Sequence, residues 1–167
     1  MSGKAGILSQ EDKDLLKIVR EDLQALGREE IERVLTEQRT VRVGFAAGEE
    51  RYLIPIGYVW LDGCLCGFTS RGRKTRLAQA DPRVSFQVDT SATTGHFTWS
   101  SVTGAGTFEV IEERAYIEKL FLMAPRWADV PDWLNDYVAK LFAAGQMVAW
   151  RIRPSSITGV KVVPPDR

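Results

Sequence analysis

The sequence predicts a mainly β protein, built as an antiparallel barrel of six to seven strands with peripheral helices. Six or seven stretches have the composition or alternation of strands, and short turns join most of them. The longer helical patterns lie at the start of the chain and late in it. Gly104 and Gly106 interrupt one long strand, which indicates the bulge or sharp coil that closing a small barrel requires.

Two helices are expected within the first 38 residues. Apolar residues recur at helical spacing across residues 9–26, with Ser9 as the N-cap and Gly27 as the natural end. A second helix is expected over residues 29–38. We therefore divide the chain into residues 1–38, N-terminal helices that pack on the barrel or on a dimer partner, and residues 39–163, the barrel, within one structural domain overall.

Strand patterns fill most of the remaining chain. Pro55 cannot donate to a ladder, so its strand is expected at a sheet edge or at a bulge. Leu61-Asp62-Gly63 has the composition of a hairpin turn. The expected strands cover residues 40–45, 52–60, 64–69, 83–89, 97–111, 146–153 and 156–163, with helices over 74–80, 112–123 and 132–144 and a loop of small residues over 91–95.

Composition and charge exclude several classes of protein. The 167 residues carry 22 Lys and Arg against 22 Asp and Glu, and this zero net charge argues against a dedicated binder of nucleic acid or of an anionic membrane. No apolar run reaches the roughly 18 residues of a membrane-spanning helix. The N-terminal pattern is not that of a signal peptide, so the expected compartment is the cytoplasm.

The two cysteines, Cys64 and Cys66, stand two positions apart on a predicted strand. Their side chains share one face of the strand, which is a poor geometry for a disulfide between them. A metal site would need more ligands, and the single histidine, His96, is distant in sequence. We therefore expect two reduced cysteines packed on a barrel strand, and no metal.

The densest polar chemistry follows the strand over residues 64–69. Phe68-Thr-Ser-Arg-Gly-Arg-Lys-Thr-Arg-Leu77 combines hydroxyl groups, a glycine and four cations. Hydroxyl and backbone N–H groups hydrogen-bond phosphate oxygens, and Arg and Lys neutralise their charge. The segment therefore predicts a phosphate-binding pocket. A solvated basic turn and a site for single-stranded RNA are the alternatives, and the zero net charge weighs against RNA.

Motifs for several reaction classes are missing from the sequence. It has no Gly-x-Gly-x-x-Gly fingerprint after a strand, no phosphate loop and no nucleophile elbow, so a kinase or a hydrolase is unsupported. His96 could move a proton or ligate haem iron, and a surface imidazole is the simpler interpretation. Trp99 and Trp150 are candidates for cofactor contact as well as for core or interface packing.

Several ordered elements together resemble one protein family. They are Pro55-Ile-Gly-Tyr-Val-Trp-Leu-Asp-Gly63, Phe68-Thr-Ser-Arg-Gly-Arg-Lys74, Asp81-Pro-Arg-Val-Ser-Phe86, Trp99-Ser-Ser-Val-Thr-Gly104 and Trp150-Arg-Ile-Arg-Pro-Ser-Ser-Ile-Thr-Gly159. In this order they are similar to the pyridoxamine 5′-phosphate oxidase-like superfamily, over roughly residues 30–163. The resemblance implies an antiparallel split β-barrel that forms a homodimer, with two FMN molecules at the subunit interface.

The resemblance also implies which residues hold the cofactor's phosphate. Arg73 and Lys74 match the basic pair that grips the phosphate of FMN. Thr69 and Ser70 match the hydroxyl-bearing end of the preceding strand, which faces the same phosphate.

A second set of residues is implied beside the isoalloxazine ring. The strand whose backbone runs along the ring corresponds to Leu53, Ile54, Pro55 and Ile56. Trp99 and Ser101 fall near the ring edge, and Trp150 lies on a strand that can reach the partner's cofactor.

The activity that the resemblance implies is an FMN-dependent oxidoreductase acting on a small molecule with a separate electron donor. The oxidase proper has an arginine at the position of Leu53 and a C-terminal substrate-binding set that we do not identify here, so vitamin B6 oxidation is not implied. The alternatives are a reductase of the same fold that uses a deazaflavin coenzyme, and a non-enzymatic protein that binds flavin or haem. No catalytic side chain is assigned.

Overall fold

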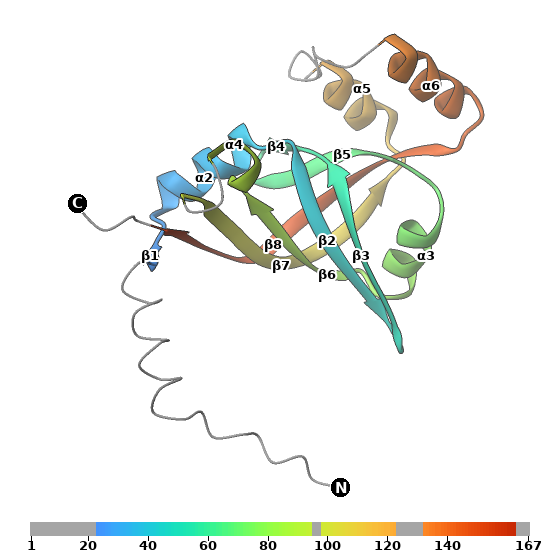
Figure 1. Ribbon diagram of the computed structural model, residues 1–167. Coiled ribbons are helices and arrows are strands. Elements are labelled where there is room, and N and C mark those ends of the chain that lie inside the picture. Colours follow the sequence, from blue (N-terminus) through green and yellow to red (C-terminus); the bar gives the residue numbers. More distant parts are fainter. Residues whose placement is uncertain (1–22, 95–97, 123–131, 163–167) are drawn as a thin grey trace, which may run out of the picture.

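The computed structural model describes residues 23–94, 98–122 and 132–162. Within these ranges the chain forms one eight-stranded sheet with the strand order β3-β2-β6-β7-β8-β5-β4, and β1 pairs with β8. All strand pairs are antiparallel, and the sheet curls into a barrel with helices around it (Figure 1). The predicted fold, a mainly β split barrel with peripheral helices, is confirmed.

The elements follow one another along the chain as strands interrupted by short helices. The strands are β1 (Leu23–Ala25), β2 (Thr40–Ala47), β3 (Glu50–Gly57), β4 (Val59–Leu61), β5 (Cys64–Ser70), β6 (Arg83–Asp89), β7 (Ser100–Ile111) and β8 (Met147–Val162). The helices are α2 (Arg28–Glu37), α3 (Arg73–Ala80), α4 (Ser91–Thr94), α5 (Arg114–Leu122) and α6 (Asp132–Ala143).

Two local predictions rest on backbone chemistry, and both are confirmed. β3 lies at the end of the strand order, so Pro55 sits on an edge strand, where its missing N–H costs least. The hairpin between β4 and β5 turns at Asp62 and Gly63, whose φ angles are 51° and 72°. Two successive positive φ angles are the signature of a type I′ turn, which matches the twist of the strands it joins.

The strands differ from the prediction in how they are divided. Tyr58 separates β3 from β4 within the predicted strand 52–60, and its hydroxyl donates to the carbonyl of Leu35 at 2.8 Å. The predicted strands 146–153 and 156–163 are one continuous strand, β8. The irregularity expected near the glycines is a register shift between Ala105 and Gly106, opposite β8. Of the residues between the two predicted strands, Pro154 pairs with Gly106 and Ser155 is the one that the register shift leaves without a partner on β7.

The N-terminal helix prediction is wrong at its C-terminal end. Residues 23–25 form β1, which pairs with residues 160–162 of β8, while residues 9–22 lie outside the described residues. Strand β8 offers unpaired backbone groups at this edge, and pairing satisfies them. Leu26 follows with its N–H donating to the carbonyl of Gly159 at 2.9 Å and its side chain buried. The predicted second helix is confirmed as α2.

The predicted loop over residues 91–95 begins as a short helix, α4. Asp89 accepts hydrogen bonds from the backbone N–H and the hydroxyl of Ser91. The Thr90 carbonyl accepts bonds from the N–H groups of Thr93 and Thr94 at 2.9 Å. These local bonds close one helical turn among small polar residues that the sequence alone marks as a loop.

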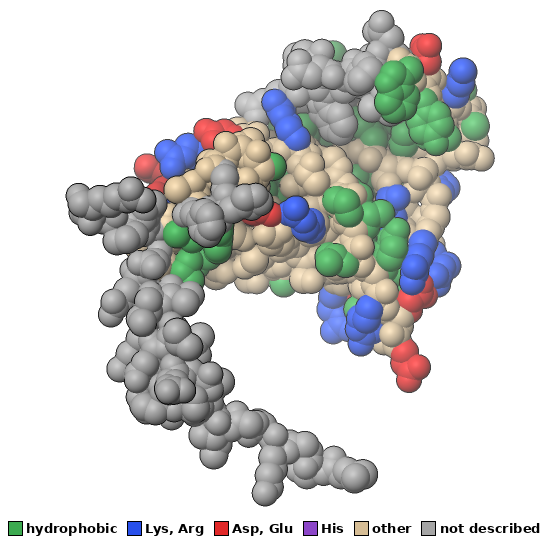
Figure 2. Space-filling view, in the orientation of Figure 1, with side chains coloured by type: hydrophobic (Ala, Val, Ile, Leu, Met, Phe, Trp, Pro, Cys, Tyr) green, Lys and Arg blue, Asp and Glu red, His purple; other side chains and the backbone are tan. Residues whose placement is uncertain are grey.

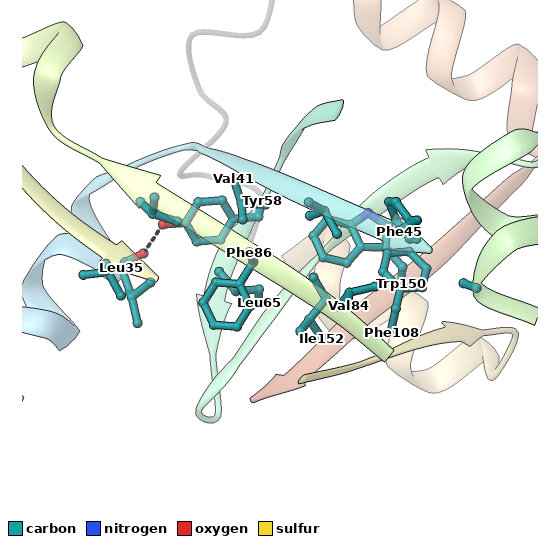
Figure 3. Packing of buried hydrophobic residues seen from close by; sticks show 14 of the residues in the cluster. Leu35, Val41, Phe45, Tyr58, Leu65, Val84, Phe86, Phe108, Trp150 and Ile152 are labelled. Atoms are coloured by element: carbon teal, nitrogen blue, oxygen red, sulfur yellow. Dashed lines mark hydrogen bonds between the residues drawn. The ribbon is translucent and has the colours of Figure 1, made fainter. Parts of the chain in front are cut away.

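The barrel interior is the main hydrophobic core. Trp150 is fully buried there, stacked on Phe108 at 5.4 Å between ring centroids, and Phe45 meets Phe108 edge-on at 5.2 Å (Figure 3). Helix α2 buries Val34 and Leu35 against the same core. Inward-pointing residues alternate with outward-pointing ones along β2 and β6, as expected for a sheet with one buried face.

A smaller apolar cluster lies between β5 and α5 on the outside of the barrel, and it contains both cysteines. Cys64 and Cys66 are free thiols and buried, as predicted. Burial raises the pKa of Cys66 to about 11, and its sulfur lies 3.1 Å from the hydroxyl of Tyr116. None of the described helices is both long and apolar enough to cross a membrane.

Candidate functional site

The predicted phosphate pocket corresponds to the turn from β5 into α3. Gly72 is the N-cap of α3, and Arg73 and Lys74 are its first residues. The Thr75 hydroxyl accepts from the N–H of Gly72 and donates to its carbonyl, both at 2.9 Å. As at other helix N-termini, the first amides are left over: those of Arg73 and Lys74 have no hydrogen-bond partner among the described residues. The turn therefore offers N–H donors at the positive end of a helix.

Lys74 is the cation in this turn that has no ion-pair partner in the described part of the chain. Its side chain is partly buried, and burial lowers the pKa of its ammonium group. No carboxylate in the part of the chain described here lies within ion-pair distance of its Nζ. A partly desolvated cation without a partner gains most from an incoming anion.

Arg73 is held by two residues of β3. Its Nε donates to Oε1 of Glu50 at 2.7 Å, and its guanidinium carbon lies 4.4 Å from the ring centroid of Tyr52. Arg76 adds Nη2 bonds to both oxygens of Glu50, at 3.1 and 3.0 Å. The bonds from Arg73 and then Arg76 lower the pKa of the Glu50 carboxyl.

Thr69 and Ser70, the two hydroxyl residues predicted beside the phosphate, lie on opposite sides of strand β5. Ser70 is exposed at the end of β5, one residue before the Arg71 turn. Thr69 is buried, on the side of β5 that carries Leu65 toward the barrel interior. Ser70 is therefore the hydroxyl that this turn presents to solvent.

The four residues predicted beside a flavin ring alternate along the edge strand β3. Ile54 and Ile56 turn toward the core, whereas Leu53 and Pro55 are exposed, Leu53 at 71% of its surface. Leu53 borders a groove of about 450 Å³ on the outer face of the sheet, and Figure 2 shows apolar side chains over this region. The other residues that line the groove include Gly44, Ser85, Thr103, Ala105 and Ser156.

Trp99 and Ser101 line a second, smaller hollow of about 280 Å³ together with Asp89 and Ser91. Gln87 lines both this hollow and the groove beside Leu53. Its amide donates to Asp89 at 3.0 Å and to Ser101 at 3.1 Å. The two hollows are therefore neighbours on one face of the sheet.

Arg42 completes the polar network on this face. Its Nη1 donates to Asp89 at 2.5 Å and to Gln87 at 3.1 Å. Burial of Asp89 raises the pKa of its carboxyl, but bonds from Ser91 and Gln87 outweigh this effect, and the net pKa is lowered. Sequence analysis missed this network, although the polar residues at alternate positions of β2 and β6 carry its signal.

The prediction that Trp150 reaches a cofactor is not supported by its position. Its side chain is fully buried inside the barrel, and its indole N–H has no hydrogen-bond partner among the residues that the structure describes. A ligand on the outer face of the sheet cannot contact a side chain that has no exposed surface. His96 lies outside the described residues, and the described residues contain no cluster of three potential metal ligands.

Solved structures with the same architecture come from several bacteria. A FAD-binding protein from Mesorhizobium loti has a TM-score of 0.69 at 24% identity, covering 85% of this chain and 98% of that one. A FAD-binding protein from Mycobacterium smegmatis has a TM-score of 0.56 at 19% identity, covering 84% of this chain and 100% of that one. The haem storage protein HutZ from Vibrio cholerae has a TM-score of 0.62 at 16% identity, covering 81% and 93%. At these identities the likeness establishes the fold.

Membership of a family rests on the sequence itself. No curated protein matches the chain significantly. The family model described as pyridoxamine 5′-phosphate oxidase matches residues 27–161, which is most of the chain and includes every element from α2 to the end of the β8 pairing with β7. The chain belongs to the pyridoxamine 5′-phosphate oxidase family.

Proposed function

We propose that this protein is a flavin-dependent oxidoreductase that binds FMN through the turn between β5 and α3. The observation that carries the proposal is Lys74, a partly buried ammonium group with no carboxylate partner in the described residues, set beside free N–H groups at a helix N-terminus. A phosphate monoester supplies the charge and the acceptor oxygens that this arrangement lacks. The family and the two FAD-binding structural relatives support a flavin as the carrier of that phosphate.

The residues of the turn fit a phosphate in different ways. Lys74 would supply the charge, Ser70 a hydroxyl donor, and Arg73 a guanidinium that already has one side bound to Glu50. The amides of Arg73 and Lys74 would complete the set of donors. Thr69 and Trp150 are not included, because both side chains are buried.

Strand β3 suits the flat ring of a flavin. It pairs with β2 along one edge, and no described strand pairs with its other edge, so alternate N–H and C=O groups there remain available. Isoalloxazine carries hydrogen-bonding groups along one rim and an apolar face, which matches a free backbone edge beside the exposed Leu53. Residues 53–56 therefore remain the proposed ring-binding segment, through their backbone.

We propose further that two copies of the chain form the complete site. The face that carries Leu53 and the groove of about 450 Å³ is open in the single chain. Trp133 and Tyr137 of α6 are also exposed, at 68% and 54% of their surfaces. Apolar surface of this kind indicates an interface. Trp99 and Ser101 would then approach the ring edge from one subunit or the other.

The bound flavin would supply hydride or single-electron transfer, and the protein would supply binding and orientation. No side chain of the described site needs to act as an acid or base for this chemistry. The expected ligands besides flavin are a small-molecule substrate and an electron donor, and no nucleic acid. The cytoplasm remains the expected compartment.

The first test is the absorbance spectrum of the purified protein, before and after incubation with FMN, FAD or riboflavin and removal of free ligand. Flavin bands retained with FMN but not with riboflavin would support the phosphate site. A protein that retains none of the three would contradict the proposal. A haem band in the spectrum of the purified protein would identify haem as the cofactor. A parallel incubation with a deazaflavin coenzyme, retained in preference to FMN, would identify the deazaflavin instead.

The homodimer is tested separately, by sedimentation across a dilution series with and without FMN. A site shared between subunits requires that dilution to monomers releases the flavin. A monomer that keeps one flavin per chain would contradict the shared site while leaving flavin binding intact.

A further inference from the structure

Arg73 uses only one corner of its guanidinium group within the described structure. Its Nε donates to Glu50 at 2.7 Å, and none of its other N–H groups has a hydrogen-bond partner among the described residues. The planar group also faces the ring of Tyr52, at 4.4 Å from the centroid. The hydrogen bond at Nε and the contact with the Tyr52 ring therefore hold the guanidinium in place, while its terminal nitrogens have no partner among the described residues.

This arrangement matters because a guanidinium binds phosphate through geometry as well as charge. Two parallel N–H···O bonds to one anion require the plane of the guanidinium to be aligned with two oxygens. An exposed arginine side chain otherwise loses rotamer freedom when it binds, which weakens the complex. Fixing Nε and the ring contact beforehand removes part of that cost.

The carboxylate does not cancel the charge of the turn. Arg76 binds both oxygens of Glu50, so one carboxylate is shared between two arginines. Lys74 is a third cation, and it has no carboxylate partner among the described residues, so the cluster keeps a positive surplus. Glu50 can therefore orient Arg73 without repelling an anion from the turn.

We propose that Glu50 and Tyr52 are positioning residues that hold Arg73 with its terminal nitrogens directed at a phosphate. The proposal rests on the proposed function, because it takes the turn to be the phosphate site of a flavin. The two residues lie two positions apart on the edge strand β3, the same strand whose backbone we propose for the ring. One strand would thus align both ends of the FMN molecule.

Glu50 could instead compete with phosphate for Arg73, and this role predicts the opposite change in FMN affinity when Glu50 is removed. If the carboxylate competed with phosphate for Arg73, removing it would tighten the binding of FMN. If it positions Arg73, removing it weakens the binding of FMN and leaves riboflavin, which has no phosphate, unaffected.

The experiment measures dissociation constants of FMN and riboflavin by flavin fluorescence for the full chain and four variants. We expect Glu50→Ala and Tyr52→Leu each to weaken FMN binding about five- to tenfold, the scale of a partly lost charge-assisted contact, with riboflavin unchanged. Tyr52→Phe keeps the ring and should bind as the parent protein does. Glu49→Ala removes the neighbouring carboxylate, which has no ion pair among described residues, and should not weaken FMN binding.

Two results overturn the positioning role. FMN binding that is unchanged or tighter in Glu50→Ala would show that the carboxylate does not orient Arg73 productively. An equal loss for FMN and riboflavin would show a general structural effect, which thermal unfolding of the variants would also reveal. A parent protein that binds riboflavin as tightly as FMN would instead overturn the phosphate site itself, and the positioning role with it.

Discussion

Two ion-pair clusters in this protein have the same parts but different surroundings. In each, one glutamate binds two arginines, and one of those arginines lies over a tyrosine ring. The members are Glu50, Arg73, Arg76 and Tyr52 at α3, and Glu109, Arg151, Arg153 and Tyr116 on β7, β8 and α5. The Glu109 cluster joins the neighbouring strands β7 and β8, with Nε of Arg151 donating to Glu109 at 2.5 Å.

The two clusters differ in the charged groups and hydrogen-bond donors that lie beside the ion pairs and have no partner among the described residues. The α3 cluster adjoins Lys74, the free amides of a helix N-terminus and the exposed Ser70. The Glu109 cluster lies on strands whose backbone groups are paired with one another. A shared carboxylate is therefore common to both clusters, and the surplus charge and available donors are what support the α3 cluster as the proposed phosphate site.

The largest expected effect comes from removing two cations of the turn between β5 and α3. Arg73→Ala combined with Lys74→Ala should weaken FMN binding by about 1.5–3 kcal/mol, or roughly ten- to hundredfold, because charge-assisted bonds to the phosphate are lost. The matched control, Arg151→Ala combined with Arg153→Ala, should leave FMN binding unchanged. Titration calorimetry measures both. Equal losses from the two pairs would remove the distinction between the clusters.

A smaller effect is expected on stability, and it falls on the other cluster. Glu109→Gln leaves the half-buried guanidinium of Arg151 without its carboxylate, so we expect the free energy of unfolding to fall by about 1 kcal/mol. FMN affinity should be unaffected. Urea denaturation with and without FMN tests this, and a weaker flavin complex in Glu109→Gln would show that the clusters are coupled.

The smallest expected effect is a pH dependence that sharpens the role of Lys74. Burial lowers the pKa of its ammonium group, so the neutral amine forms at a lower pH than for a solvated lysine. Because only the charged form attracts phosphate, FMN affinity should decline as the pH rises through that lowered pKa, by about a few-fold, the size of one charge contact. Lys74→Arg stays charged and should abolish this decline. The ratio of affinities of the two proteins cancels any ionisation of the flavin, and a ratio independent of pH would contradict the assignment.

Sequence analysis predicted the features that depend on local chemistry. The run from Thr69 to Lys74 indicated the polar turn, and Pro55 indicated an edge strand. Both could be predicted because hydroxyl groups, cations and a missing N–H are properties of the residue itself and do not depend on distant parts of the chain. It did not predict Glu50 as the partner of Arg73, since the two are 23 residues apart and meet only because α3 packs beside the β2–β3 hairpin.

The sequence could not predict the burial or pairing of residues whose position depends on the rest of the fold. A tryptophan such as Trp150 suits a core as well as a ligand, and only its place inside the folded barrel shows that it is buried. Leu23–Ala25 fits a helical pattern, but the open edge of β8 outweighs this intrinsic preference. Thr69 and Ser70 look equivalent in sequence, and the alternation of β5 separates them.

The length of β8 has a consequence for how the protein folds. This strand pairs with β1, β5 and β7, so residues 147–162 join segments as far apart in sequence as Leu23 and Val162. Such non-local pairing slows folding, because distant loops must close before contacts are gained. On the ribosome the barrel cannot form until nearly all of residues 23–162 have emerged. Until then the inner faces of β2, β5 and β6 remain exposed, and this period of synthesis is when the chain is most prone to aggregate.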